Sequence, residues 1–249
     1  MYYRVRLSWD DPGSQLGAYT ILQNAINKCD ENPGYSVFDE SGTCVHNSGD
    51  VVIQTMSYKA KLKKKISAAH PKGQTVTVTR NFAKQWVLAD GTIVPNRKDY
   101  LDLAKQIYDA ECTYPKAAAE KWINETFVTS DTEFLFWCSK YCQKVYIFQG
   151  SVGAWHLIKT YKCSTGNIKY GDGSDQGVSF AWKIWDKCKA FKGPYGTQYY
   201  NQHYSSKGGN SIHKGSVGKP ATHGCIGLSK AAAIWVFDNI PINSRVVVW

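Results

Sequence analysis

The sequence predicts a mainly β chain of several domains: a small α+β module at the N-terminus, a small β-barrel in the centre and a β-rich, sandwich-like domain at the C-terminus. Two observations lead to this prediction. Short segments of alternating apolar and polar residues recur along the chain, separated by turns that contain Gly or Pro. The chain also has 249 residues, 43% hydrophobic and 14% aromatic, which is enough to fill more than one core.

The N-terminal module is predicted over residues 1–50. "YYRVRLSW" alternates as a strand does, with Tyr3, Val5 and Leu7 on one face. "YSVFDESGTCVHN" predicts a hairpin that turns at residues 40–42. Between them, residues 16–29 space their small and apolar side chains for one face of a helix: Ala18, Ile21, Leu22, Ala25 and Ile26.

The central β-barrel is predicted over residues 51–103, where short strands are broken at 71–73 and 90–91. Residues 104–116 are predicted to form a helical linker, and "KAAAEKWINETF" continues a helix after Pro115. The C-terminal domain then covers residues 117–249, with strands at "FLFWC", "KVYIFQG" and "WHLIKTYKC". The linker prediction rests on the helical spacing of five residues: Leu101, Leu103, Ala104, Ile107 and Tyr108.

The formal net charge of +10 is unevenly distributed. Residues 1–50 have three basic and seven acidic side chains, whereas residues 51–103 have ten basic and three acidic ones. An anionic polymer is therefore an expected partner of the chain after residue 50. A bacterial wall polymer fits this expectation, and nucleic acid is not expected because the chain has no nucleic-acid-binding motif.

No stretch reaches the roughly 18 apolar residues of a membrane span, so none is expected. The N-terminus also lacks the apolar stretch of a signal peptide, so an export signal was removed or the protein leaves the cell by another route.

The eight cysteines are widely spaced and form no C-x-x-C pair, which argues against a zinc site. Cys138 and Cys142 either bridge a hairpin or are two small half-buried residues. So many thiols without an evident pairing scheme suit a reducing or anaerobic setting.

Cys225 stands apart because it lies in a polar, glycine-flanked turn before a predicted helix, in "ATHGCIGLSKAAAIW". A structural cysteine is usually surrounded by apolar residues. A catalytic cysteine instead needs a base that helps to form its thiolate. The sequence offers two candidate bases, His213 and His223. His223 is separated from Cys225 by Gly224 alone, and a tight turn would direct its ring away from the sulfur.

His213 can approach the thiol because Gly, Ser and Pro residues between positions 213 and 225 allow the chain to loop back. Gly224 permits a tight turn whose backbone N–H groups point at an oxyanion. Spacing alone also leaves two other interpretations open. His203 could join His213, His223 and Cys225 as metal ligands, or the group has no special role.

"THGCIGL" resembles the [ST]-H-G-C-[IV]-R-L signature of the L,D-transpeptidases, and "SIHK" resembles the histidine segment that precedes it in this family. "KVYIFQGSVGAWHLIKTYKCSTG" (144–166) and "INETFVTSDTEFLFW" resemble earlier parts of the same domain. The resemblance covers residues 117–249 and implies a β-rich sandwich of the YkuD type. Residues 1–50 resemble a repeat appended to Gram-positive wall amidases, and 58–101 resemble bacterial SH3-like wall-binding modules.

Carried over to this sequence, the resemblance implies that Cys225 is the nucleophile and His213 the general base. His223, Gly224 and the Cys225 amide would form the oxyanion site. We further expect three residues to contact the substrate, namely Thr222, Ser211 and Tyr199. No cofactor and no metal are expected.

Two departures from the family pattern stand out. Gly227 occupies the position of the family's arginine, and "DQGVSFAWKIW" retains only Gly177 and Phe180 of the family's T-P-x-G-x-F. The interval from His213 to Cys225 is also shorter than is usual in the family.

The family acts on peptidoglycan outside the cell, so the resemblance implies a Gram-positive wall enzyme whose substrates are stem peptides. Cys225 would attack the bond before the terminal D-alanine of a stem peptide, form a thioester and pass the acyl group to a neighbouring stem in a 3→3 cross-link. If water takes the acyl group, the enzyme is an L,D-carboxypeptidase. The sequence is also compatible with a cysteine peptidoglycan hydrolase and with a non-catalytic wall-binding protein.

Overall fold

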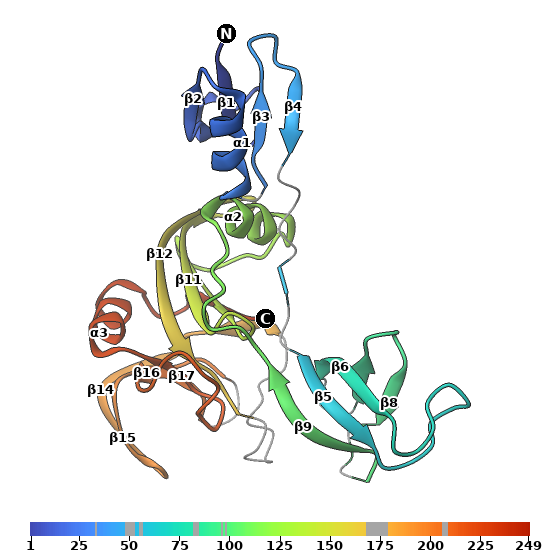
Figure 1. The fold of residues 1–249 in the computed structure, drawn as a ribbon. Coiled ribbons are helices and arrows are strands. Elements are labelled where there is room, and N and C mark those ends of the chain that lie inside the picture. The colour runs from blue at the N-terminus through green and yellow to red at the C-terminus, as the bar shows by residue number, and fades with distance from the viewer. Residues whose placement is uncertain are drawn as a thin grey trace. The chain divides into compact units, whose positions relative to one another are not determined.

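The structure is a computed structural model (Figure 1), which describes residues 1–32, 34–47, 53–54, 57–81, 85–95, 97, 99–167, 179–205 and 209–249. The chain divides into two compact units. The first contains residues 1–53 and 114–127, and the second contains residues 54–113 and 128–249. The described residues form three β-sheets and three α-helices, which confirms the mainly β fold class.

The first unit contains a four-stranded sheet in the order β2-β1-β3-β4. β3 and β4 pair in antiparallel fashion, which confirms the predicted hairpin. The helix expected over 16–29 is wrong in its first half, because Gly17–Tyr19 forms β2 and pairs with β1. The elements are β1 (Tyr3–Arg6), a short 3-10 helix (Pro12–Ser14), β2 (Gly17–Tyr19), α1 (Leu22–Asp30), β3 (Ser36–Phe38) and β4 (Cys44–Asn47).

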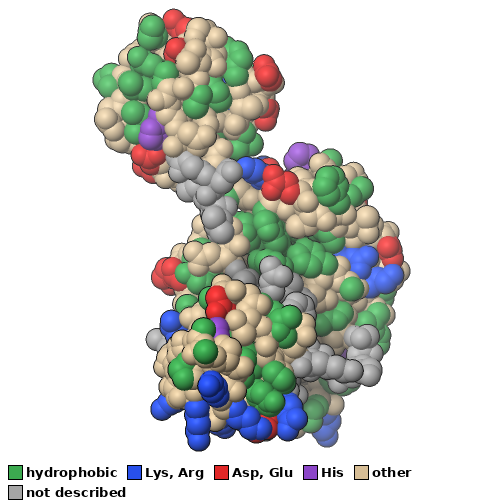
Figure 2. Space-filling model, turned by 90° about the vertical axis from the view of Figure 1, so that its right-hand side faces the viewer, with side chains coloured by type: hydrophobic (Ala, Val, Ile, Leu, Met, Phe, Trp, Pro, Cys, Tyr) green, Lys and Arg blue, Asp and Glu red, His purple; other side chains and the backbone are tan. Residues whose placement is uncertain are grey.

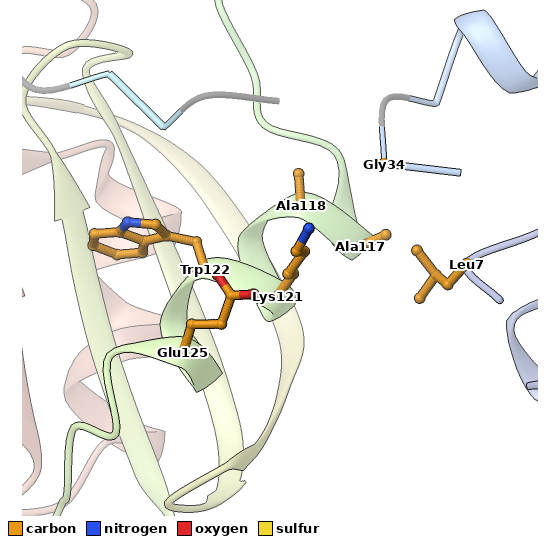
Figure 3. Close-up of a pocket in the computed structure, with 7 residues that line it drawn as sticks. All are labelled: Leu7, Gly34, Ala117, Ala118, Lys121, Trp122 and Glu125. Carbon is orange, nitrogen blue, oxygen red and sulfur yellow. The ribbon is translucent and has the colours of Figure 1, made fainter. Parts of the chain in front are cut away.

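Helix α2 (Lys116–Glu125) belongs to this unit although it is distant in sequence. Ala117 joins the core formed by Val5, Ala25 and Val37. Figure 3 shows a small pocket beside α2 whose wall includes Leu7, and none of the residues around Cys225 lines it.

The second unit begins with a five-stranded antiparallel sheet in the order β8-β7-β6-β5-β9. The helical linker predicted from residue 104 is wrong, because residues 101–107 form strand β9 along β5, and in the described part of this segment no helix begins before Lys116. Tyr108, expected on a buried helical face, is 38% exposed. The strands are β5 (Ser57–Leu62), β6 (Thr75–Asn81), β7 (Gln85–Leu88), β8 (Ile93–Pro95) and β9 (Leu101–Ile107).

A nine-stranded sheet forms the rest of the second unit, in the order β13-β18-β10-β11-β12-β17-β16-β15-β14. The strands predicted at "FLFWC", "KVYIFQG" and "WHLIKTYKC" are confirmed as β10 to β12. The elements are β10 (Phe134–Ser139), β11 (Lys144–Ser151), β12 (Ala154–Ser164), β13 (Ser179–Lys183), β14 (Asp186–Gly193), β15 (Gly196–His203), β16 (Ser211–Lys214), β17 (Ile226–Leu228), α3 (Lys230–Asn239) and β18 (Arg245–Val248).

This sheet curls around one core, to which both its halves contribute. Phe136 and Ile147 come from one half, and Ile212 and Leu228 come from the other. Helix α3 adds Val236 to the same core, and the Ser229 hydroxyl caps its first turn by accepting from Ala232 N at 3.3 Å. β16, β17 and α3 are thereby fixed against a close-packed interior.

None of the helices in the described ranges is long and apolar enough to cross a membrane. Figure 2 shows Lys and Arg side chains gathered along the lower edge of the face in view. The five-stranded sheet and its first loop contribute several exposed lysines: Lys59, Lys61, Lys63, Lys64, Lys65 and Lys72.

Candidate active site

Cys225 and His213 are brought together by two parallel strands. β16 pairs with β17 in a register that places Ile212 beside Ile226 and His213 beside Gly227. Cys225 directly precedes β17, so by the same register it lies beside Ser211. Because alternate residues of a strand share a face, Ser211 and His213 point to the same side as Cys225.

The two side chains form a hydrogen-bonded thiol–imidazole pair. His213 Nδ1 lies 2.8 Å from the Lys214 carbonyl oxygen and donates to it. This bond fixes the tautomer and leaves Nε2 as the ring nitrogen that faces the sulfur. The arrangement is that of a nucleophile with an oriented base.

The pair shifts both pKa values toward the thiolate–imidazolium form. Burial raises the pKa of Cys225, but the hydrogen bond and the charge of His213 outweigh this effect and hold the pKa below its ordinary value. Burial likewise lowers the pKa of His213, whereas its bonds to Cys225 and to the Lys214 carbonyl raise it above the ordinary value. A thiolate favoured in this way is the reactive form of cysteine.

A buried polar network supports the sulfur on its other side. Ser211 Oγ lies 3.7 Å from Cys225 Sγ, and Gln198 Nε2 lies 3.8 Å from it. Ser211 Oγ also donates to Gln198 Oε1 at 2.9 Å. Asn201 Nδ2 contacts both residues, at 2.9 Å from Ser211 Oγ. The network directs the Gln198 amide N–H at Cys225 Sγ, where it can stabilise a thiolate.

Gln198 and Asn201 were missed by the sequence analysis. Both lie on β15, where strict alternation would put residues three apart on opposite faces. Tyr200 breaks the alternation because its φ is +56°, in the left-handed region. The only signal in the sequence was a pair of amides in a strand near the histidine segment, which by itself specifies no site.

The turn before Cys225 is held by its own side chains. Thr222 Oγ1 donates to the Cys225 carbonyl at 2.6 Å and accepts from Gly224 N at 3.2 Å. Tyr204 OH donates to the Gly224 carbonyl at 3.3 Å. The φ of Gly224 is +120°, a conformation that L residues rarely adopt, so this position favours glycine.

His223 points to a different neighbour from His213. Its ring stacks on Tyr195, at the tip of the β14–β15 hairpin, with centroids 4.0 Å apart and planes inclined by 6°. The remaining predicted site residues differ in exposure. Ser211 is fully buried in the polar network, whereas Tyr199 is 48% exposed and lies 5.7 Å from Lys214 Nζ, measured to its ring centroid.

Gly227 is explained by close packing. A Cβ at this position would lie 2.8 Å from the Ser216 carbonyl oxygen and 3.5 Å from Gly215 Cα. The loop that follows His213 therefore runs directly over Gly227, in the space that a longer side chain would need. Because the short segment after His213 passes so close to Gly227, it leaves no room there for an arginine side chain. Gly177 lies outside the described residues, and Phe180 packs on Trp249 with ring centroids 5.7 Å apart.

Around Cys225 the described residues contain no group of three potential metal ligands. His203, the residue needed to complete a metal site there, instead binds Asp186 through Nδ1 at 3.2 Å and stacks on Trp185. A three-residue group does occur in the first unit, where the ligand atoms of Cys29, Asp30 and His46 lie within 4.8 Å of one another.

The mainly β domain therefore holds an oriented thiol–imidazole pair on two parallel strands, which is the geometry of a candidate cysteine–histidine site. Residues 138–248 match the model of the YkuD-type L,D-transpeptidase catalytic domain. This part of the chain is thus similar to the catalytic domain of the L,D-transpeptidases. A comparison with curated protein sequences gave no match.

Three solved structures illustrate the similarity. A fused Zn-dependent amidase/peptidase/peptidoglycan-binding domain-containing protein from Clostridium acetobutylicum is 26% identical over 54% of this chain and 59% of its own, with a TM-score of 0.44. An L,D-transpeptidase from Mycobacterium smegmatis is 19% identical over 47% and 58%, with a TM-score of 0.38. One from Mycobacterium tuberculosis is 14% identical over 77% and 80%, with a TM-score of 0.37. The chain covers less than two thirds of the first two proteins.

Proposed function

We propose that the protein is a peptidoglycan L,D-transpeptidase that forms 3→3 cross-links through a thioester on Cys225. The observation that carries this proposal is the pairing of Cys225 with His213, in which each side chain shifts the pKa of the other toward the ion pair. The family match over residues 138–248 supports the substrate class, which is the stem peptide of peptidoglycan.

In the proposed mechanism, the Cys225 thiolate attacks the carbonyl that joins the third residue of a donor stem to its terminal D-alanine. The negative charge that develops on the carbonyl oxygen is stabilised by the backbone N–H of Cys225, with His223 beside it. The Gly224 N–H donates to Thr222 Oγ1 at 3.2 Å, so Gly224 contributes through the shape of the turn. Protonated His213 then gives its proton to the leaving D-alanine amine, and a thioester remains on Cys225.

The second half of the reaction decides the product. Neutral His213 takes a proton from the incoming amine of a neighbouring stem, and this amine displaces the thiolate to form the cross-link. When water takes the place of the amine, the product is a shortened stem and the enzyme acts as a carboxypeptidase. The proposed substrate contacts are Thr222, through the turn that it holds, Ser211, through the polar network, and Tyr199, on the exposed part of β15.

The first test is acylation by a carbapenem, followed by a mass measurement on the intact protein. Opening of the β-lactam ring releases no leaving group, so we expect the protein to gain the mass of one whole carbapenem, located on the peptide that contains Cys225. A protein that gains no mass would be a non-catalytic wall-binding protein. The Cys225→Ala variant is the matched control and should remain unmodified.

The second test is product analysis with purified disaccharide-tetrapeptide. Cross-linked dimers together with free D-alanine support the transpeptidase, and shortened monomers alone support the carboxypeptidase. Cleavage of intact walls, seen as falling turbidity, would instead identify a hydrolase.

We also propose that residues 51–103 attach the enzyme to anionic polymers of a Gram-positive wall, outside the cell. The support is the net +7 charge of this segment together with its exposed lysines. Removal of residues 1–103 should weaken co-sedimentation with walls, most strongly at low salt, because such attraction is screened by ions. Carbapenem acylation should persist in this shortened protein, and equal sedimentation of the two proteins would contradict the proposal.

A further inference from the structure

Away from Cys225, two thiols lie in contact. Cys112 follows β9 in the segment that leads to α2, and Cys142 lies in the turn between β10 and β11. Their Sγ atoms are 2.7 Å apart. A disulfide bond is about 2.05 Å long, so a small side-chain movement would bring the two sulfurs within bonding distance.

The backbone around Cys112 is held against the β10–β11 turn independently of the sulfurs. Asp109 N donates to the Tyr141 carbonyl at 2.9 Å, and Lys144 Nζ donates to the carbonyls of Ala110 (2.9 Å) and Cys112. On the other side, Cys142 N donates to Ser139 Oγ at 3.2 Å. These contacts keep the effective concentration of one thiol at the other high.

A second close pair of thiols is less accessible to solvent than Cys112 and Cys142. Cys138 and Cys163 lie 3.8 Å apart in the core, and both are fully buried. Cys112 is only half-buried, so an oxidant can reach it, while its partner Cys142 is fully buried. Among the described residues, the side chains that contact Cys225 Sγ are those of His213, Ser211 and Gln198, and none of them is a thiol.

We propose that Cys112 and Cys142 form a disulfide when the protein meets an oxidising medium, and that Cys225 forms no disulfide with another cysteine of the chain. With a small disulfide such as oxidised glutathione, Cys112 loses its proton, attacks one sulfur and releases one glutathione thiol. Cys142 then attacks Cys112 Sγ in the mixed disulfide and releases the second. Both protein S–H bonds are replaced by one S–S bond, and the oxidant is reduced to two thiols.

The disulfide would hold the chain at Cys112, just before the segment that contains α2. It closes a loop of about 30 residues, which removes conformational freedom from the unfolded chain. The segment leaves the second unit at residue 113 and returns to it at residue 128. The disulfide would therefore tie the exit point to the β10–β11 turn.

The test equilibrates the full chain in a glutathione redox buffer, blocks the remaining thiols with iodoacetamide in denaturant and digests with trypsin without reduction. Lys140 separates Cys138 from Cys142, so the predicted product is unambiguous. Peptides 106–116 and 141–144 should appear joined and lighter by two hydrogens than the sum of their thiol forms. Cys225 should appear in no cross-linked peptide.

The thermal midpoint supplies a second measurement. We expect oxidation to raise it by several degrees, on the order of 5–10 °C, because of the loop closed in the unfolded chain. Cys112→Ser should abolish this rise, whereas the control Cys188→Ser, at another half-buried cysteine, should keep it. Recovery of Cys112 and Cys142 in alkylated form, or of Cys142 joined to another cysteine, would overturn the proposal, whatever the protein does to peptidoglycan.

Discussion

Two cysteines of the second unit, Cys225 and Cys112, show that a neighbouring side chain can outweigh burial in setting the pKa of a thiol. Cys225 is the more buried of the two, with 8% of its surface exposed, and yet its pKa lies below the ordinary value because of His213. Cys112 is half-buried, and burial together with the Cys142 thiol raises its pKa to about 12. An imidazole therefore favours the thiolate of Cys225, whereas burial and a second thiol disfavour the thiolate of Cys112.

Replacement of the nucleophile should have the largest effect. We expect Cys225→Ala to abolish carbapenem acylation and D-alanine release. The thermal midpoint should change by only about 2–4 °C, since a single sulfur atom in polar contacts is lost. Cys112→Ala should retain activity, and measurable turnover by Cys225→Ala would refute the assigned nucleophile.

Alkylation of the reduced protein tests the contrast directly. At neutral pH, iodoacetamide should label Cys225 at least about 10²-fold faster than Cys112, because the thiolate is the reacting form. The labelling of Cys225 should persist as the pH falls below 9, the ordinary cysteine value, whereas labelling of Cys112 should become appreciable only toward its pKa of about 12. Peptide mapping over a range of pH measures both rates, and equal rates would show that His213 does not activate the thiol.

His213 and His223 form a matched pair of substitutions. His213→Ala should raise the thiol pKa of Cys225 and slow acylation about 10²-fold or more, as the loss of a general base does. His223→Ala should act mainly through the lost stacking on Tyr195, with a smaller change in the thiol pKa. The fraction of Cys225 present as thiolate, measured by absorbance over a range of pH, gives the thiol pKa of each variant. A rise in pKa confined to His223→Ala would reverse the assignment.

Gly227→Ala should have the smallest effect on acylation, but it should clearly lower the stability of the fold. The added methyl group would meet the Ser216 carbonyl, and such overpacking costs about 1–3 kcal/mol of stability. Gly193→Ala is a suitable control, because a Cβ there meets its nearest neighbour at an ordinary 3.5 Å. Unfolding by denaturant measures both variants, and equal stability would show that the loop over Gly227 moves aside freely.

Much of the site could be predicted from the sequence because its signals are local. The polar turn before Cys225, with Gly224 at a positive φ, is encoded within a few residues. The Gly and Pro residues between His213 and Cys225 allow the chain to loop back, so the sequence predicted that the two residues could lie close together. The family resemblance indicated which histidine is the base. The hairpin over residues 36–47 and strands β10 to β12 were predicted for the same reason, since their pattern and turns are written in one short segment.

Features that depend on contacts between residues distant in sequence were decided by the tertiary structure. Leu101 and Ile107 fit both a helix and a strand, and pairing with β5 made them part of β9. Gln198 and Asn201 join one polar network beside Cys225 because Tyr200 takes a left-handed conformation within β15. Cys112 meets Cys142 because backbone contacts bring two loops 30 residues apart together. The sequence by itself determined the turn that contains Cys225 and the β pattern. The packing of distant strands decided which side chains surround the sulfur, because such contacts have no local signature.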